Sequence, residues 1–157
     1  TKNPVIRVMP NTPAQIGKGV SAISPGANAS GADLSLAKNL LSNSGLVVEV
    51  SESDQDAVTA LSGSGPAYFF SFVEAMINAG VKLGLTNEIA TQLAIGTISG
   101  SAAMLKESGL DATTLRKNVT SPNGTTAAAL SVFTDKDLEK IVFDAMAAAK
   151  KRAQELA

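Results

Sequence analysis

The chain has 157 residues, of which 45% are hydrophobic, and its 13 basic and 14 acidic side chains give a net charge of −1. This composition is typical of a globular chain, and the balanced charge argues against nucleic acid or an anionic membrane surface as a partner. Because the sequence has neither cysteine nor histidine, disulfides, iron–sulfur clusters and Ser-His or Cys-His nucleophiles are excluded, and no metal site is expected. Catalysis would therefore depend on positioning by hydroxyls, amides, carboxylates and backbone groups, or on a cofactor.

The first 50 residues predict a small α/β segment. Short apolar runs at 5–9, 20–23 and 46–50 predict strands, and the apolar spacing of residues 33–43 predicts a helix before the third strand. Three strands and one helix make a poor domain, because a parallel or mixed sheet normally carries helices on both faces. We therefore expect residues 1–50 to be the last strands of a larger, Rossmann-like sheet, within a piece of a longer protein.

Residues 51–157 show helical periodicity almost throughout, which places a domain boundary near residue 51. Ser53 is a candidate N-cap for the first helix, and Pro66 fits the first position of the next one. Gly84 is expected to end that helix, and Thr86 to cap the following one. The predicted fold is thus mostly α, with a small α/β remnant at the N-terminus followed by an all-helical domain.

The helix predicted over residues 89–105 has no charged side chain, yet its polar residues and glycines make it unsuitable as a membrane span. Its apolar side chains point in several directions, and a helix that is apolar all round must be buried all round. Gly96 and Gly100 favour close approach by another helix. We therefore expect an obligate homodimer with interleaved helices, the alternative being a monomeric bundle around this helix. A last helix is predicted over 136–156.

Two loops have ordinary structural explanations beside a functional one. The segment Met9-Pro10-Asn11-Thr12 follows the first strand, at a position where open α/β sheets commonly bind ligands, but a proline-flanked turn is the commoner explanation. The serine- and glycine-rich run at 61–66 lacks the spacing and the lysine of a phosphate loop, and it follows a helix instead of a strand. We interpret this run as a kink that lets two helices pack closely.

A third loop, "TSPNGTT" at 120–126, places several hydroxyls before a helix whose first amides have no partner within that helix. Such a helix end can hold a carboxylate without any arginine or lysine. Capping of the helix by Asn123 or Thr125 is the commoner role for these residue types. Both interpretations remain open on the residues alone.

Four blocks of the sequence together resemble the pyrroline-5-carboxylate reductases, which make proline by hydride transfer from NAD(P)H to a cyclic imine. They are "VIRVMPNTPAQIGKG" (5–19), "DAVTALSGSGPAYFF" (56–70), "AGVKLGL" (79–85) and "LRKNVTSPNGTTAAAL" (115–130). The resemblance covers essentially the whole chain, but no G-x-G-x-x-G occurs, which implies that the main NADP or NAD site is absent and the chain alone inactive. It further implies an interleaved homodimer able to form larger assemblies, a cyclic imino acid as substrate and a cytoplasmic location.

The resemblance also implies roles for individual residues. The substrate-binding positions it implies are Ser121, Gly124, Thr125 and Thr126, with Thr126 beside the ring nitrogen as the catalytic hydroxyl. The cofactor-binding positions it implies are Asn118, Glu52, Met9, Pro10, Asn11 and Thr12. Asn123 replaces the usual glycine of the turn, and its tolerance of left-handed backbone predicts that the turn is preserved. A protonated imine is already electrophilic, so orienting it toward the hydride needs no histidine.

Two other classes of function stay open. One is a non-catalytic helical module that dimerises or binds carboxylates, in which residues 120–126 are only a capped turn. The other is a related β-hydroxyacid dehydrogenase, which would need a lysine placed for acid catalysis. Lys82 and Lys106 lie in predicted helices without a surrounding motif, which disfavours that class. Neither the preference between NADH and NADPH nor the number of assembled dimers follows from the sequence.

Overall fold

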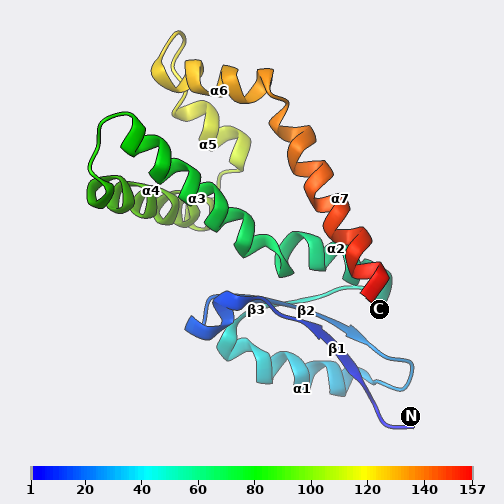
Figure 1. Ribbon diagram of the computed structural model, residues 1–157. Coiled ribbons are helices and arrows are strands. Elements are labelled where there is room, and N and C mark those ends of the chain that lie inside the picture. Colours follow the sequence, from blue (N-terminus) through cyan, green and yellow to red (C-terminus); the bar gives the residue numbers. More distant parts are fainter. Residues whose placement is uncertain (1, 157) are drawn as a thin grey trace. The chain divides into compact units, whose positions relative to one another are not determined.

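The computed structural model describes residues 2–156, and most of them are helical (Figure 1). The chain forms two compact units, one made by the residues up to Tyr68 together with those from Phe143 onward, the other by Phe69–Val142. The helices are α1 (Gly31–Leu41), α2 (Gln55–Val58), α3 (Gly65–Lys82), α4 (Asn87–Glu107), α5 (Ala112–Asn118), α6 (Thr125–Asp135) and α7 (Leu138–Leu156). The predicted mostly α fold with a small α/β part at the N-terminus is confirmed.

The first unit contains one mixed sheet with the strand order β1-β2-β3. The strands are β1 (Ile6–Met9), β2 (Gly19–Pro25) and β3 (Gly45–Glu49). β1 runs antiparallel to β2 and β2 parallel to β3, where Gly19 lies opposite Gly45. Gly45 has φ 136°, and a Cβ there would lie 2.1 Å from the carbonyl oxygen of Gly19, so only glycine fits this close approach. Helix α1 covers one face of the sheet (Figure 1).

Helix α1 begins two residues before the predicted start at residue 33, because of a capping box that the apolar spacing does not reveal. Asp33 donates its backbone N–H to the Ser30 hydroxyl at 3.3 Å, and its carboxylate accepts the Ser30 backbone N–H at 2.8 Å. Together these bonds satisfy amides that the first helical turn leaves free. The hydrogen bonds from Ser30 lower the pKa of the Asp33 carboxyl below its ordinary value.

The passage from the sheet to the helices differs from the prediction. Ser53 is not an N-cap, because it lies inside a 3-10 turn (Glu52–Asp54) and its hydroxyl is 3.1 Å from that of Ser51. Helix α2 follows without any side-chain cap. It then widens into a π-helical turn, Thr59–Gly63, before α3 begins one residue ahead of Pro66. The predicted kink between two helices is therefore a change of helical hydrogen-bond pattern.

A buried polar chain joins the sheet to the start of α2. Ser24 and Gln55 are fully buried, as is the neighbouring Ile23. The Gln55 side-chain amide donates to the Ser24 hydroxyl at 2.6 Å, and that hydroxyl donates to the Val50 carbonyl oxygen at 2.9 Å. In the part of the chain that the structure describes, the side-chain oxygen of Gln55 has no hydrogen-bond partner. These two hydrogen bonds fix the first residue of α2 to the central strand of the sheet.

The predicted boundary signals between α3 and α4 are confirmed. Gly84 has a left-handed φ of 104°, and the Thr86 hydroxyl accepts the Ile89 backbone N–H at 3.3 Å as the N-cap of α4. The two helices pack closely after the turn, since a Cβ on Gly80 would lie 3.2 Å from the Cβ of Ala90. Glycine at this position permits the contact.

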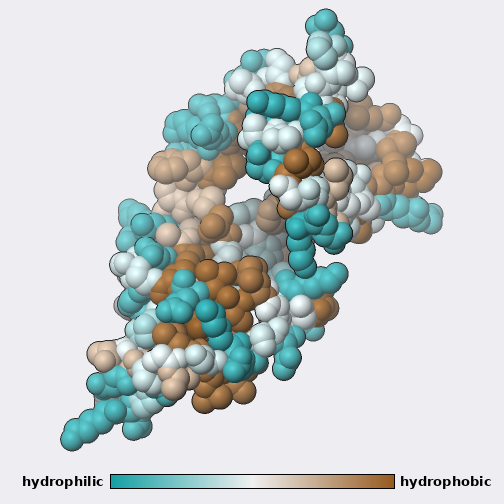
Figure 2. Space-filling model, turned by 180° about the vertical axis from the view of Figure 1, so that it is seen from behind, coloured by the Kyte–Doolittle hydropathy of each residue, from teal (hydrophilic) through white to brown (hydrophobic). Residues whose placement is uncertain are grey.

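Much apolar surface stays uncovered in the single chain, as the brown areas of Figure 2 show. On α4, Leu93 is 56% and Ile95 52% exposed, while Ala90 and Ala94 are buried. Apart from the backbone of α4 itself, no atom of residues 2–156 lies within 4 Å of a Cβ built on Gly96. A single chain therefore does not enclose α4 as the monomeric alternative requires. Among residues 2–156, no helix combines the length and the hydropathy needed to cross a bilayer.

Candidate functional site

The turn before α6 has the backbone path predicted for it, but its capping differs. Asn123 has φ 58°, the left-handed conformation expected of it. Gly124 donates its N–H to the Ser121 carbonyl at 3.1 Å and is itself the N-cap of α6, without a side-chain cap hydrogen bond. Capping by Asn123 or Thr125 is therefore wrong.

A glycine N-cap leaves the start of α6 open to an external acceptor. The Ala128 N–H bonds to the Gly124 carbonyl at 3.1 Å, and the amides before it begin the helix without a capping oxygen. Free amides at the positive end of a helix dipole favour an anion. A Cβ on Gly124 would lie 2.3 Å from the Ser121 Oγ, so the serine hydroxyl rests directly against the glycine. Amides and hydroxyl together can accommodate a carboxylate.

Helix α5 leads into this turn and carries Asn118 as its last residue, exposed at the surface. Its N-cap is Asp111, whose carboxylate accepts the Thr114 backbone N–H at 2.9 Å and the Thr114 hydroxyl at 3.0 Å. These bonds lower the pKa of Asp111. At the other end, Thr120 donates its hydroxyl to the Arg116 carbonyl at 2.6 Å. Both ends of α5 are thus fixed by side chains.

In the first unit, the loop after β1 is held by its own side chains. Asn11 donates its side-chain amide to the Ser62 carbonyl at 3.1 Å and accepts the Val20 backbone N–H at 2.8 Å. The methyl group of Met9 lies against Gly63, where an added Cβ would be 2.3 Å from it. The remaining loop residues, Pro10 and Thr12, are exposed.

Glu52 forms an ion pair that the sequence did not reveal. Its Oε1 accepts a hydrogen bond from Arg7 Nη1 at 2.5 Å, and the two side chains are 58% and 44% exposed. The only local signal was an isolated charge within the apolar first strand.

The site residues implied by the resemblance fall into two groups. In the first unit are Met9, Pro10, Asn11, Thr12 and Glu52; in the second are Asn118, Ser121, Gly124, Thr125 and Thr126.

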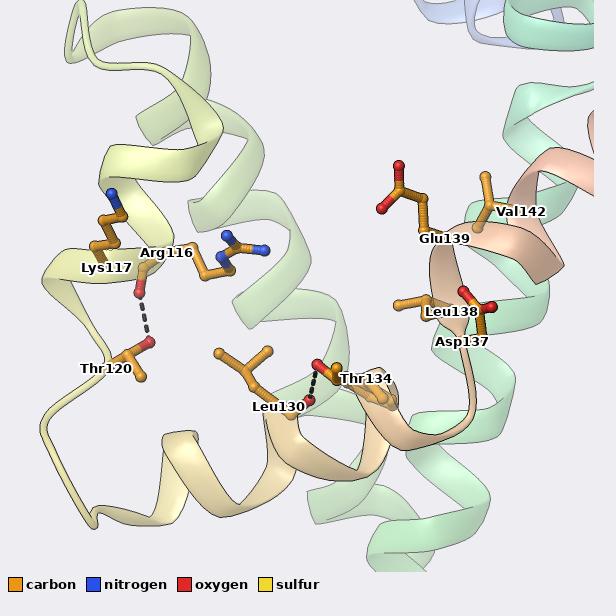
Figure 3. A pocket seen from close by; sticks show the side chains of 10 residues that line it. Arg116, Lys117, Thr120, Leu130, Thr134, Asp137, Leu138, Glu139 and Val142 are labelled. Atoms are coloured by element: carbon orange, nitrogen blue, oxygen red, sulfur yellow. Dashed lines mark hydrogen bonds between the residues drawn. The ribbon is translucent and has the colours of Figure 1, made fainter.

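A cavity of about 950 Å³ lies in the second unit between α5, α6 and the start of α7 (Figure 3). Arg116 and Lys117 are on the α5 side, Asp137 and Glu139 at the start of α7, and Leu130 between them. None of the implied substrate residues lines this cavity. Its charged residues have no shared motif along the chain, and sequence reasoning missed them.

A second, apolar cavity of about 520 Å³ lies between α3 and α4. Its lining consists of Phe69, Phe70, Val73, Glu74, Ile77, Asn78, Ile95 and Ile98. With only Glu74 and Asn78 as polar members, it offers little to orient a polar substrate. Within residues 2–156, no group of three acidic side chains is placed to hold a metal ion.

Comparisons with known proteins agree with the resemblance. A family model described as pyrroline-5-carboxylate reductase dimerisation matches residues 52–156. The pyrroline-5-carboxylate reductase of Corynebacterium melassecola is 46% identical over 153 residues, which cover 98% of this chain and 57% of that protein. The enzyme of Pseudomonas aeruginosa is 46% identical over 155 residues, with the same two shares. The chain thus spans 57% of the length of these curated relatives.

Solved structures of pyrroline-5-carboxylate reductases have the same fold. That from Coxiella burnetii superposes with a TM-score of 0.96 at 37% identity, covering 100% of this chain and 58% of that one. The Plasmodium falciparum structure, described as having NADP bound, gives a TM-score of 0.92 at 35% identity and covers 99% of this chain and 62% of that one.

Proposed function

This chain belongs to the pyrroline-5-carboxylate reductase family, and we propose that it supplies the dimerisation and substrate-binding part of an enzyme that reduces 1-pyrroline-5-carboxylate to L-proline. The observation that carries the proposal is the open N-terminus of α6, where free amides and the Ser121 hydroxyl lie together. We further propose a domain boundary between residues 50 and 51, which the matched region 52–156 supports.

In the proposed complex, the substrate carboxylate lies at the start of α6. The amides of Thr125 and Thr126 donate to it, and the Ser121 hydroxyl adds a third hydrogen bond. Thr126 is half-buried, and within the described residues its hydroxyl has no partner. That hydroxyl is free to bond the ring nitrogen, orient the imine and stabilise the amine product.

The proposed cofactor contact is limited to the reacting end of a nicotinamide dinucleotide, NADP or NAD. When bound, this group supplies the hydride. Met9, Pro10, Asn11 and Thr12 fit this role as a backbone surface, because the Asn11 amide is already engaged within the protein. Glu52 and Asn118 complete the proposed set. The sequence contains no G-x-G-x-x-G, so the pyrophosphate is not assigned to these residues.

We propose a homodimer with interleaved helices as the functional form, in the cytoplasm. The partly exposed apolar side chains of α4 and the apolar cavity against α3 support it, because a monomer rarely leaves such contiguous apolar surface uncovered.

The catalytic role of Thr126 is tested in an intact enzyme made by joining the cofactor-binding segment of the Corynebacterium relative to this chain. Thr126→Ala should lower kcat by roughly a hundredfold, the usual scale for a positioned proton-transfer group. Thr134→Ala is the matched control on the same helix, because the Thr134 hydroxyl donates to the Leu130 carbonyl of its own helix at 3.0 Å. This variant should keep kcat within about twofold of the parent value. Unchanged turnover in Thr126→Ala would remove that role.

A second measurement separates the enzyme from a non-catalytic helical module, which the partial coverage of the relatives keeps open. Proline is titrated into the isolated chain and followed by NMR. Shifts confined to the amides of Thr125 and Thr126 support the inherited carboxylate site. No shift at millimolar proline would favour a dimerisation module in which residues 120–126 are only a turn.

A further inference from the structure

The π-helical turn Thr59–Gly63 leaves backbone carbonyls without their ordinary helical donors. In an α-helix the Ser64 N–H would bond to the Ala60 carbonyl, but here it donates to Thr59, five residues back, at 2.8 Å. The freed Ala60 carbonyl accepts the Tyr68 hydroxyl at 3.1 Å. Turns of this kind occur mostly as single insertions at functional places in helices.

The Ser62 carbonyl is freed by a different cause. Its α-helical donor would be the nitrogen of Pro66, which carries no hydrogen. The next N–H along the chain, that of Ala67, donates instead to the Ser64 carbonyl at 3.0 Å. The side-chain amide of Asn11, from the loop after β1, donates to this carbonyl at 3.1 Å. A proline in α3 thus creates the acceptor that a loop fifty-one residues earlier satisfies.

The other end of the Asn11 side chain is equally engaged. Its oxygen accepts the Val20 backbone N–H at the start of β2, at 2.8 Å. Beside it, the Met9 methyl group lies against Gly63 in the π-helical turn. Asparagine suits both bonds because its short side chain carries a donor and an acceptor on separate atoms, whereas aspartate lacks the donor.

We propose that Asn11 is a positioning residue that couples the loop Met9–Thr12 to the π-helical turn, so that strand end and helix start move as one body. Its side chain therefore serves this coupling and does not contact a cofactor. The importance of the loop for a nicotinamide rests on the proposed function, whereas the coupling itself does not.

The test uses amide hydrogen exchange of the 157-residue chain, without cofactor or substrate. Asn11→Asp keeps the acceptor for Val20 but removes the donor to Ser62 and places a carboxylate near that carbonyl oxygen. Exchange should accelerate roughly tenfold over both 10–20 and 59–68, as expected when a half-buried hydrogen bond is lost. Asn3→Asp makes the same chemical change at an exposed position and should leave both segments unchanged.

A second variant separates coupling from a merely structural role. Pro66→Ala restores an N–H four residues after Ser62, so the helix can satisfy its own carbonyl. In that background Asn11→Asp should accelerate exchange over 59–68 by no more than about twofold, because the two changes share one acceptor. Acceleration confined to 10–20, or an equal effect in both backgrounds, would overturn the coupling. If Asn11→Asp alone does not fold, the double variant must recover a cooperative fold, and its failure to do so would overturn the proposal as well.

Discussion

At the residue scale, Gln55 carries the one buried side-chain polar atom that lacks a hydrogen-bond partner among residues 2–156. It is fully buried and its side-chain amide donates to Ser24, yet no described residue bonds to its side-chain oxygen. An unpaired buried acceptor loses its hydration without compensation. What offsets this is the relay through Ser24 to the Val50 carbonyl, which connects the sheet to α2.

This hydrogen-bonded relay predicts different effects on stability for substitutions of its two members. Ser24→Ala leaves the Gln55 amide and the Val50 carbonyl unpaired, and it should lower the free energy of unfolding by about 2 kcal/mol. Gln55→Leu removes the orphaned oxygen while Ser24 keeps its bond to Val50, and it should change that free energy by less than about 1 kcal/mol, in either direction. Urea denaturation of both variants checks this; a neutral Ser24→Ala would contradict the relay.

Substitution of Gly124 should weaken carboxylate binding much more than it lowers the free energy of unfolding. In Gly124→Ala the new Cβ would meet the Ser121 hydroxyl at 2.3 Å, and that hydroxyl can rotate away. The free energy of unfolding should therefore fall by about 1 kcal/mol or less, while proline or a simple carboxylate binds at least roughly tenfold more weakly after losing one hydrogen bond. Gly31→Ala, in open space at the start of α1, is the control and should leave binding intact, as measured by NMR titration.

At the element scale, helix ends were predictable where a single residue determines them. Gly84 and Thr86 mark the turn between α3 and α4 as expected. The start of α1 was missed because Ser30 and Asp33 form a capping box as a pair. The apolar spacing, from which the helix was predicted, does not indicate such a pair. The π-helical turn was missed for a further reason: its freed carbonyls are satisfied by Asn11 and Tyr68, and one of these partners is distant in sequence.

The same limit applies to the candidate site. The turn at 120–126 was located from its residue types, and the left-handed Asn123 followed from them. The glycine N-cap did not, because capping propensity favours the side-chain oxygens of Asn123 and Thr125. Likewise, the partner of Glu52 is Arg7, and a contact between residues so far apart in sequence depends on how the sheet and helices pack.

The stability of helix α5 should depend on pH through its N-cap, Asp111. The pKa of Asp111 is lowered by its bonds to Thr114, so its stabilising effect is complete above the unfolded pKa near 3.8 and is lost as pH falls through the lower folded value. NMR signals of residues 112–118 should show fraying only in that acidic window. In Asp111→Asn the side-chain oxygen remains but the charge does not, and the titration should disappear. Fraying that persists with the same midpoint would assign it to another group.

At the scale of the whole molecule, the single chain has too little enclosed apolar volume for its length. Within the described residues, the buried hydrophobic ones are Ala22, Ile23, Ala60, Ala90 and Ala94, which are mostly small. Larger side chains such as Phe70 and Leu93 are 66% and 56% exposed. Because burial of apolar area supplies most of the favourable free energy of folding, the proposed dimer would supply much of the stability of the helical part. Folding and dimerisation should then be linked.

That linkage predicts the effect of a charge in the apolar cavity between α3 and α4. Phe70→Asp removes a large apolar contact and would bury a carboxylate in the dimer, so the dissociation constant of the dimer should rise by at least roughly a hundredfold. Leu40→Asp is the matched control, because this side chain is 70% exposed on α1, outside the matched dimerisation region, and it should leave association unchanged. Sedimentation equilibrium over a range of concentrations measures both. The parent chain should also show an unfolding midpoint that rises with concentration, and a concentration-independent monomer in either experiment would contradict a dimer built on α3 and α4.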